Sequence, residues 1–210
     1  MIPFLTFSYH HIFPNYGLAI ILLTVVIKAI FYPLTNKQYT SMKKMQDLQP
    51  LLKELQEKLK KQPEKLQKEI MGFYKSHKVN PLSGCLPLLV QLPFFFAIYY
   101  TIGSPGFKEL LTAPGVNPGI FSFWVPNLEL PDHSFILPMV IAVSTYFSQK
   151  LMTMDPQQAK IFAFMPIFMF FISISMPSGV LLYWSVSQIL SYLQQWWILK
   201  TYQKTTALTV

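Results

Sequence analysis

Residues 17–34 read GLAIILLTVVIKAIFYPL, an apolar stretch that is interrupted by one charged residue, Lys28. A helix of about 20 predominantly apolar residues is long enough to cross the hydrocarbon core of a bilayer. The stretch therefore predicts a membrane span. A lysine inside a span is costly to insert, so Lys28 is the first candidate for a functional residue.

The composition of the 210-residue chain agrees with a membrane protein. Hydrophobic residues make up 52% of the chain and charged residues 12%, whereas soluble domains carry about 25% charged residues. A single cysteine, Cys85, excludes a disulfide framework and a thiolate metal cluster, and the four histidines lie outside the apolar stretches. We therefore expect neither a metal site nor a cofactor.

Four further apolar stretches predict additional membrane spans. Together with residues 17–34 they give five transmembrane helices, so the two ends of the chain are expected on opposite sides of the membrane. These four predicted spans cover residues 81–103, 134–152, 161–176 and 179–199. An outer interfacial segment, an outer loop, a cytoplasmic loop and a cytoplasmic tail are predicted at residues 1–16, 104–133, 153–160 and 200–210.

All 17 basic residues are lysines, and they are distributed unevenly between the two sides. Fifteen lie in the segments 35–80, 150–160 and 200–210, and only Lys108 lies in a segment on the other side. The positive-inside rule then predicts an outer N-terminus and a cytoplasmic C-terminus. Since arginine supplies most forked contacts with base edges, its absence argues against readout of a nucleic-acid sequence.

Residues 35–80 predict a cytoplasmic hairpin of two helices, broken at Gln62 and Pro63. Two interpretations stay open: the hairpin only packs on itself, or it is a lysine-rich arm that meets anionic headgroups or a partner. In the second interpretation, the adaptable apolar face of the first helix contacts the client or partner. The residues predicted for this contact are Met42, Met45, Leu52 and Leu55.

Lys28 has no acidic residue inside any predicted span with which to pair. Either its amine snorkels to the inner interface, or it faces a water-filled groove that opens to the cytoplasm. The groove is the preferred interpretation, because an unpaired cation needs water or many acceptors. Neutral polar residues available to line it are Thr24, Gln91, Ser144, Ser148, Gln149, Ser185, Ser187 and Gln188.

Several stretches resemble the YidC family of membrane protein insertases. GLAIILLTVVIKAIFYPLTNKQYTSMKKMQDLQP (17–50) is similar to the first core span and the start of the hairpin, and VNPLSGCLPLLVQLPFFFAIYY (79–100) is similar to the next span. Residues 144–152, 155–171 and 177–195 resemble the other three spans, in the family's order. The chain resembles a short form of the family or its conserved five-span core.

The resemblance implies an all-α membrane protein with five transmembrane helices around a hydrophilic groove that opens to the cytoplasm and to lipid. The family normally has one arginine in this groove, and the matching residue here is Lys28. Gln149 and Trp184 fall on groove-lining positions of the family. The second and fourth spans are where the family is thought to contact its client.

The implied function is that of a membrane protein insertase and chaperone, which moves client transmembrane segments and short polar tails into the bilayer without making covalent bonds. The implied partners are nascent membrane proteins and the lipid of a bacterial inner membrane, and a role for the ribosome or the Sec translocon stays open. The alternative is a small-solute or anion transporter or channel with Lys28 as its binding site.

Overall fold

The computed structural model describes residues 1–80, 86–120, 124–151 and 162–207 of the chain. Within these ranges the regular elements are helices, apart from an isolated bridge between Pro131 and Pro177. The predicted all-α fold class is thereby confirmed. The helices are α1 (Ile2–His11), α2 (Tyr16–Lys58), α3 (Pro63–Ser76), α4 (Leu86–Ile102), α5 (Pro105–Thr112), α6 (Ile136–Leu151), α8 (Met165–Ile174) and α9 (Ser178–Ala207).

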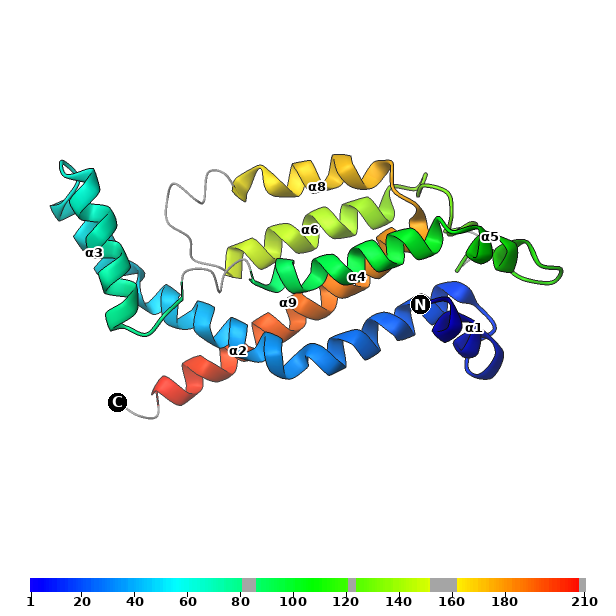
Figure 1. Ribbon diagram of the computed structural model, residues 1–210, viewed down its shortest axis with the longest axis horizontal. Helices are drawn as coiled ribbons and strands as arrows, with labels where there is room; N and C mark the ends of the chain where they lie inside the picture. Colours follow the sequence, from blue (N-terminus) through cyan, green and yellow to red (C-terminus); the bar gives the residue numbers. More distant parts are fainter. Residues whose placement is uncertain (81–85, 121–123, 152–161, 208–210) are drawn as a thin grey trace.

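The long helices run along the long axis of the molecule and form an elongated bundle (Figure 1). Helix α9 packs against α2, α4 and α6, and α6 also packs against α8. The short helices α1 and α5 lie with the N-terminus at one end of the bundle, whereas α3 lies beyond the other end (Figure 1). The C-terminus lies toward the α3 end, so the two ends of the chain are far apart.

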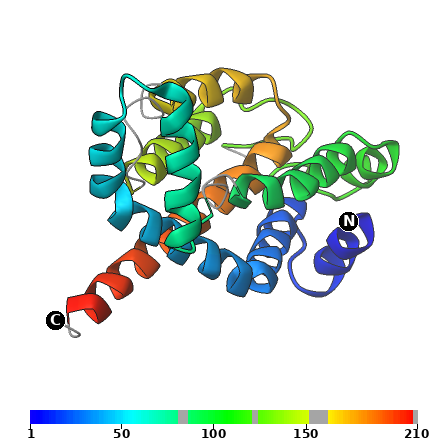
Figure 2. The same ribbon diagram turned by 60° about the vertical axis from the view of Figure 1, so that its left-hand side comes forward.

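Helix α2 extends through 43 residues and contains both the predicted span 17–34 and the first helix of the predicted hairpin. It begins at the cap residue Asn15, whose Oδ1 accepts from the backbone N of Leu18 at 3.0 Å. Among the described residues, α2 is the helix that is both long and apolar enough to cross a membrane, and shorter apolar helices cover Leu89–Ile102 and Phe162–Ile174. Helix α3 folds back along the distal part of α2 (Figure 2).

The apolar core lies toward the α1 end of the bundle and is built from α1, α2, α4, α5, α6 and α9. Its centre includes fully buried residues from different helices, such as Leu5, Ile98 and Phe107. Gly17 lets α2 approach the loop before α6 closely, because an added Cβ would lie only 2.5 Å from the Cβ of Ile120. This packing fixes the start of α2, and with it the position of Lys28 along the bundle.

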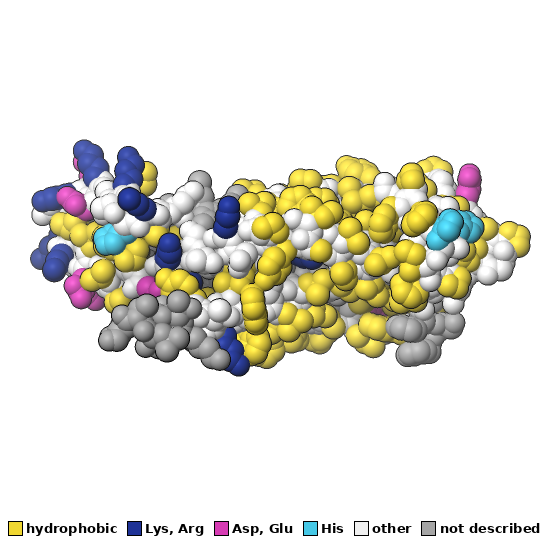
Figure 3. Space-filling model, turned by 90° about the horizontal axis from the view of Figure 1, so that it is seen from below, with side chains coloured by type: hydrophobic (Ala, Val, Ile, Leu, Met, Phe, Trp, Pro, Cys, Tyr) yellow, Lys and Arg dark blue, Asp and Glu magenta, His cyan; other side chains and the backbone are white. Residues whose placement is uncertain are grey.

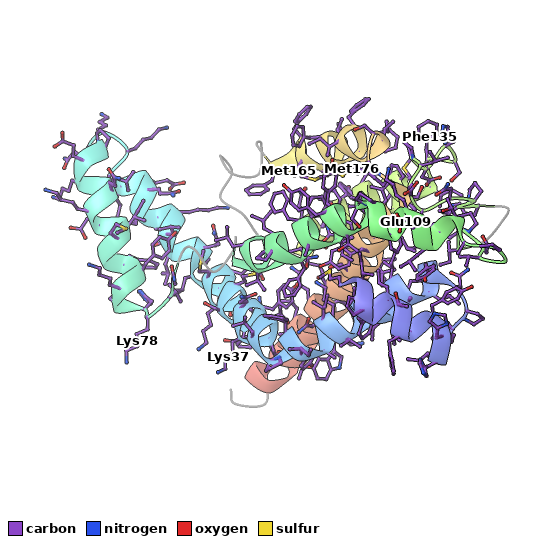
Figure 4. The ribbon with its side chains drawn as sticks, turned by 45° about the vertical axis from the view of Figure 1, so that its right-hand side comes forward. Lys37, Lys78, Glu109, Phe135, Met165 and Met176 are labelled. Carbon is purple, nitrogen blue, oxygen red and sulfur yellow. The ribbon has the colours of Figure 1, made fainter. Side chains whose placement is uncertain are left out.

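The surface of the molecule is divided along its length. Hydrophobic side chains cover the middle of the face in Figure 3, while lysines gather toward the end that carries α3. Figure 4 places Lys37 and Lys78 toward this lysine-rich end and Glu109 and Phe135 toward the opposite one. Such an apolar face exposes too much hydrophobic surface for water and suits contact with lipid.

Candidate functional site

Lys28 is half-buried in α2, and its ammonium group reaches two other helices. Its Nζ donates to Oε1 of Gln91 on α4 at 3.3 Å and to Oγ of Ser191 on α9 at 2.7 Å. Both acceptors are neutral, so they orient the ammonium without cancelling its charge. An ammonium has three N–H donors, and these two bonds leave one N–H for a further acceptor.

Gln91 is the centre of a network around this charge. Its Oε1 also accepts from Oγ of Ser187 at 3.2 Å, and its Nε2 donates to the hydroxyl of Tyr183 at 2.6 Å. Lys28 can only donate, so the amide oxygen must face it. Because Tyr183 and Ser187 are 1% and 2% exposed, the amide is held in this orientation by buried groups.

The polar groups of α9 continue from this network toward the lysine-rich end. Tyr183, Ser187 and Ser191 are spaced by four residues and therefore share one face of the helix. Ser191 also forms a side-chain hydrogen bond with the buried Tyr39 of α2. One turn further, Oε1 of Gln194 lies 3.0 Å from Oγ1 of Thr35. We call Lys28, Gln91, Tyr183, Ser187, Ser191 and Tyr39 the Lys28 cluster.

The other residues predicted for the groove have no hydrogen bond to Lys28 in the described structure. Thr24 is buried and donates to the carbonyl of Ile20 within its own helix at 2.7 Å. Gln188 donates to Oγ1 of Thr145 on α6 at 3.1 Å. The ring of Trp184 forms a T-shaped contact with the ring of Phe95, with centroids 5.2 Å apart, and Gln149 is half-buried near the end of α6. Among the predicted lining residues Gln91 therefore bonds directly to Lys28.

Sequence reasoning did not identify three members of the Lys28 cluster, namely Ser191, Tyr183 and Tyr39. The available signal was the spacing of Tyr183, Ser187 and Ser191, which places three hydroxyls on one stripe of an otherwise apolar helix. The partner of that stripe could not be read from the same pattern, because spacing does not give the rotation of α9 relative to α2.

The residues predicted for the hairpin contact differ in their exposure. Met42 packs with Tyr39 and with Ile198 of α9, and Met42 and Leu52 are both buried. Met45 and Leu55 are half-buried. Met42 and Leu52 could therefore reach a client only after the distal part of α2 moves away from its neighbours, and the contact role of all four stays a prediction.

The described part of the chain contains no group of three His, Cys, Asp or Glu side chains that could hold a metal ion. The fold and the site together define a class of protein: an α-helical membrane protein with a hydrogen-bonded cation between its helices. The matching family model is described as "60Kd inner membrane protein" and covers residues 8–205. The chain belongs to this family, and the predicted resemblance to YidC is confirmed.

Two curated relatives and one solved structure support the same assignment. Proteins named "Membrane protein insertase YidC" from Francisella philomiragia subsp. philomiragia and Francisella tularensis subsp. novicida are 46% and 45% identical over 198 residues, covering 93% of this chain and 34% of each relative. The chain thus spans about a third of their length. A structure entitled "Active YidC insertase crystal structure with the first transmembrane domain resolved" matches with a TM-score of 0.70 and 28% identity, over 91% of this chain and 43% of that one.

Proposed function

We propose that this chain inserts transmembrane segments and short polar tails of client proteins into the bilayer without making or breaking covalent bonds. The names of its relatives and its similarity to an insertase structure support this function. The single observation that carries it is the Lys28 ammonium, which neutral groups of α4 and α9 orient among apolar surroundings.

The physical task of such a protein is to lower the cost of moving a polar tail through lipid. Polar groups that lose their water without gaining a hydrogen bond are strongly disfavoured in an apolar medium. A polar cluster partway through the bilayer offers replacement partners, and the free N–H of Lys28 offers one to a client carboxylate. Attraction between the ammonium and an acidic tail is stronger there than in bulk water.

We infer five spans in a bacterial inner membrane, with the N-terminus outside and the lysine-rich end in the cytoplasm. The distance between the chain ends and the collection of lysines beside α3 support this orientation (Figures 1 and 3). Thr24, Gln91, Gln149, Trp184 and Gln188 would line the groove around Lys28. Nascent membrane proteins and lipid are the proposed partners, and the hairpin would meet the client first.

The outer faces of α4 and α8 would guide the apolar segment of the client into lipid. Both helices expose large aromatic side chains, such as Tyr100, which is 71% exposed, and Phe171, which is 65% exposed. A client helix that slides along these faces stays in contact with apolar groups throughout. Partitioning of its own apolar surface supplies the driving force, so no nucleotide is required.

The experiment uses liposomes that contain the purified chain and a single-span client with an acidic tail. Lys28→Ala should lower insertion of this client about tenfold, equivalent to about 1.4 kcal/mol, whereas Lys28→Arg should retain it. Lys37→Ala is the matched control, because Lys37 is an exposed lysine of the same helix. Equal insertion by the Lys28→Ala and unmodified chains would contradict the proposal, and anion flux without any client would favour a transporter.

A further inference from the structure

An apolar cavity lies between α6 and α9, and none of its lining residues belongs to the Lys28 cluster. Its volume is about 280 Å³. It extends over nine residues of α6, from Met139 to Phe147, and the eight steps between them correspond to about 12 Å of helix. The lining residues are Met139, Val140, Val143, Ser144, Phe147, Ile189 and Tyr192.

The lining offers little to a polar ligand. The hydroxyl of Ser144 already donates to the carbonyl of Val140 in the same helix turn. Several lining side chains, including Met139, Val143 and Ile189, are each between 43% and 52% exposed, so the cavity opens onto the apolar outer surface. An elongated apolar cavity on a lipid-facing surface suits a hydrocarbon chain better than a soluble molecule.

Two lysines lie beyond the same end of this cavity. The rings of Phe147 and Tyr192, 6.2 Å apart, mark its limit toward the lysine-rich end. Lys150 follows Phe147 by one turn, and Lys200 follows Tyr192 by eight residues, or about 12 Å of helix. Both positive charges are therefore displaced from the cavity in the same direction.

Each of these lysines is placed over an aromatic ring. Nζ of Lys150 lies 4.8 Å from the ring centroid of Tyr146, and Nζ of Lys200 lies 4.8 Å from that of Trp196. Such cation–π contacts restrict an ammonium without neutralising it. Tyrosine and tryptophan are also the side chains that favour the headgroup level of a membrane.

The charge of the two lysines is not compensated by the helices that carry them. The sequences of α6 and α9 contain no Asp or Glu. The ion pairs found among the described residues are Lys43–Asp47 and Lys108–Glu129, and neither involves Lys150 or Lys200. Two exposed cations beyond one end of an apolar cavity thus match the two parts of a lipid with a negatively charged headgroup.

We propose that the α6–α9 cavity binds one acyl chain of an anionic phospholipid, whose phosphate is bound by Lys150 and Lys200. A zwitterionic lipid could place a chain in the same cavity but would gain less from two positive charges. Basic pockets between transmembrane helices at the cytoplasmic side are known to select anionic headgroups. This site is independent of the Lys28 cluster and would hold a lipid whether or not a client is present.

The test measures which lipids stay with the full chain after extraction from bilayers of phosphatidylcholine and phosphatidylglycerol in equal amounts. Native mass spectrometry of the extracted protein should show retained phosphatidylglycerol in excess. The double variant Lys150→Gln and Lys200→Gln should lower this retention about tenfold. The double variant Lys37→Gln and Lys108→Gln removes the same charge elsewhere and should leave it unchanged.

A second variant, Val143→Trp, tests the acyl-chain part of the site. The larger side chain fills the cavity from an exposed position and should lower retention of phosphatidylglycerol, while circular dichroism should show an intact fold. Unchanged retention of phosphatidylglycerol in either variant would overturn the proposal. Equal retention of both lipids, or displacement of phosphatidylglycerol by inorganic phosphate alone, would also overturn it. Conversion of a dimer to a monomer by Val143→Trp would identify a second copy as the occupant and would also overturn it.

Discussion

Lysines in the two halves of α2 have different surroundings and different partners. In the half that enters the bundle, Lys28 is half-buried and bonds to neutral oxygens of α4 and α9. In the half that extends into the hairpin, Lys43 forms an ordinary ion pair with Asp47 one turn away, at 2.9 Å. The first charge stays available to an anion, whereas the second is already paired.

The difference shows that the surroundings, rather than the residue type, give a charge its role. A surface ion pair such as Lys43–Asp47 contributes only about 0–1 kcal/mol to stability, because water solvates both partners well. A cation among apolar helices lacks that solvation, so it needs the surrounding hydroxyl and amide groups. Variants at both kinds of site should therefore differ in their effects on insertion and stability.

Reversing the charge at Lys28 should have the largest effect. Lys28→Glu turns attraction of an acidic tail into repulsion and removes the donor to Gln91 and Ser191. We expect insertion of an acidic-tailed client into liposomes to fall about a hundredfold, or about 2.7 kcal/mol. Lys43→Glu reverses a charge on the same helix and should change insertion little. A neutral-tailed client should be less sensitive, and equal losses for both clients would contradict a role of charge.

Breaking the centre of the network should reduce stability more than breaking a single bond elsewhere. Gln91→Leu leaves Lys28, Ser187 and Tyr183 each without one partner, so we expect a loss of about 2–3 kcal/mol in the free energy of unfolding. Gln188→Leu is the matched control, because it removes only the bond to Thr145, and should cost about 1 kcal/mol. Thermal unfolding in detergent measures both. Equal losses would indicate that the network does not act as a unit.

Removing the tip of the hairpin, where α2 ends and α3 begins, should impair function more than stability. Helix α3 contains no buried residue, so deletion of residues 53–67 removes little of the packed bundle. The bundle should unfold within about 2 °C of the unmodified chain, while insertion falls several-fold. Full insertion after this deletion would leave the hairpin as a structural spacer that only packs on itself.

The fold class and the candidate functional charge of Lys28 could be predicted from the sequence, because both depend on local patterns. The long apolar stretch of α2 and its single lysine are visible without any tertiary contact. Gln91 was also identified, since it is a rare amide in an apolar stretch.

The partners of Lys28 on α9 could not be chosen in the same way. Ser187 and Gln188 are adjacent in sequence but about 100° apart around the helix. The structure directs Ser187 toward Gln91 and Gln188 toward Thr145 on α6. Only the packing of α9 against both α2 and α6 decides which residue joins the cluster, and that rotation is a tertiary property.

The smallest effect concerns a second buried glutamine, Gln38, which contrasts with Gln91. Gln38 is 4% exposed, and neither its Oε1 nor its Nε2 has a hydrogen-bond partner in the described structure. A buried amide without partners costs free energy that an apolar side chain of similar shape avoids. Gln38→Met should therefore raise the free energy of unfolding by about 1 kcal/mol and leave insertion unchanged, whereas the same change at Gln91 should lower stability. Thermal unfolding of both variants side by side is the measurement. A loss of stability in Gln38→Met would mean that the amide is satisfied in the membrane, and that the contrast between the two glutamines does not hold.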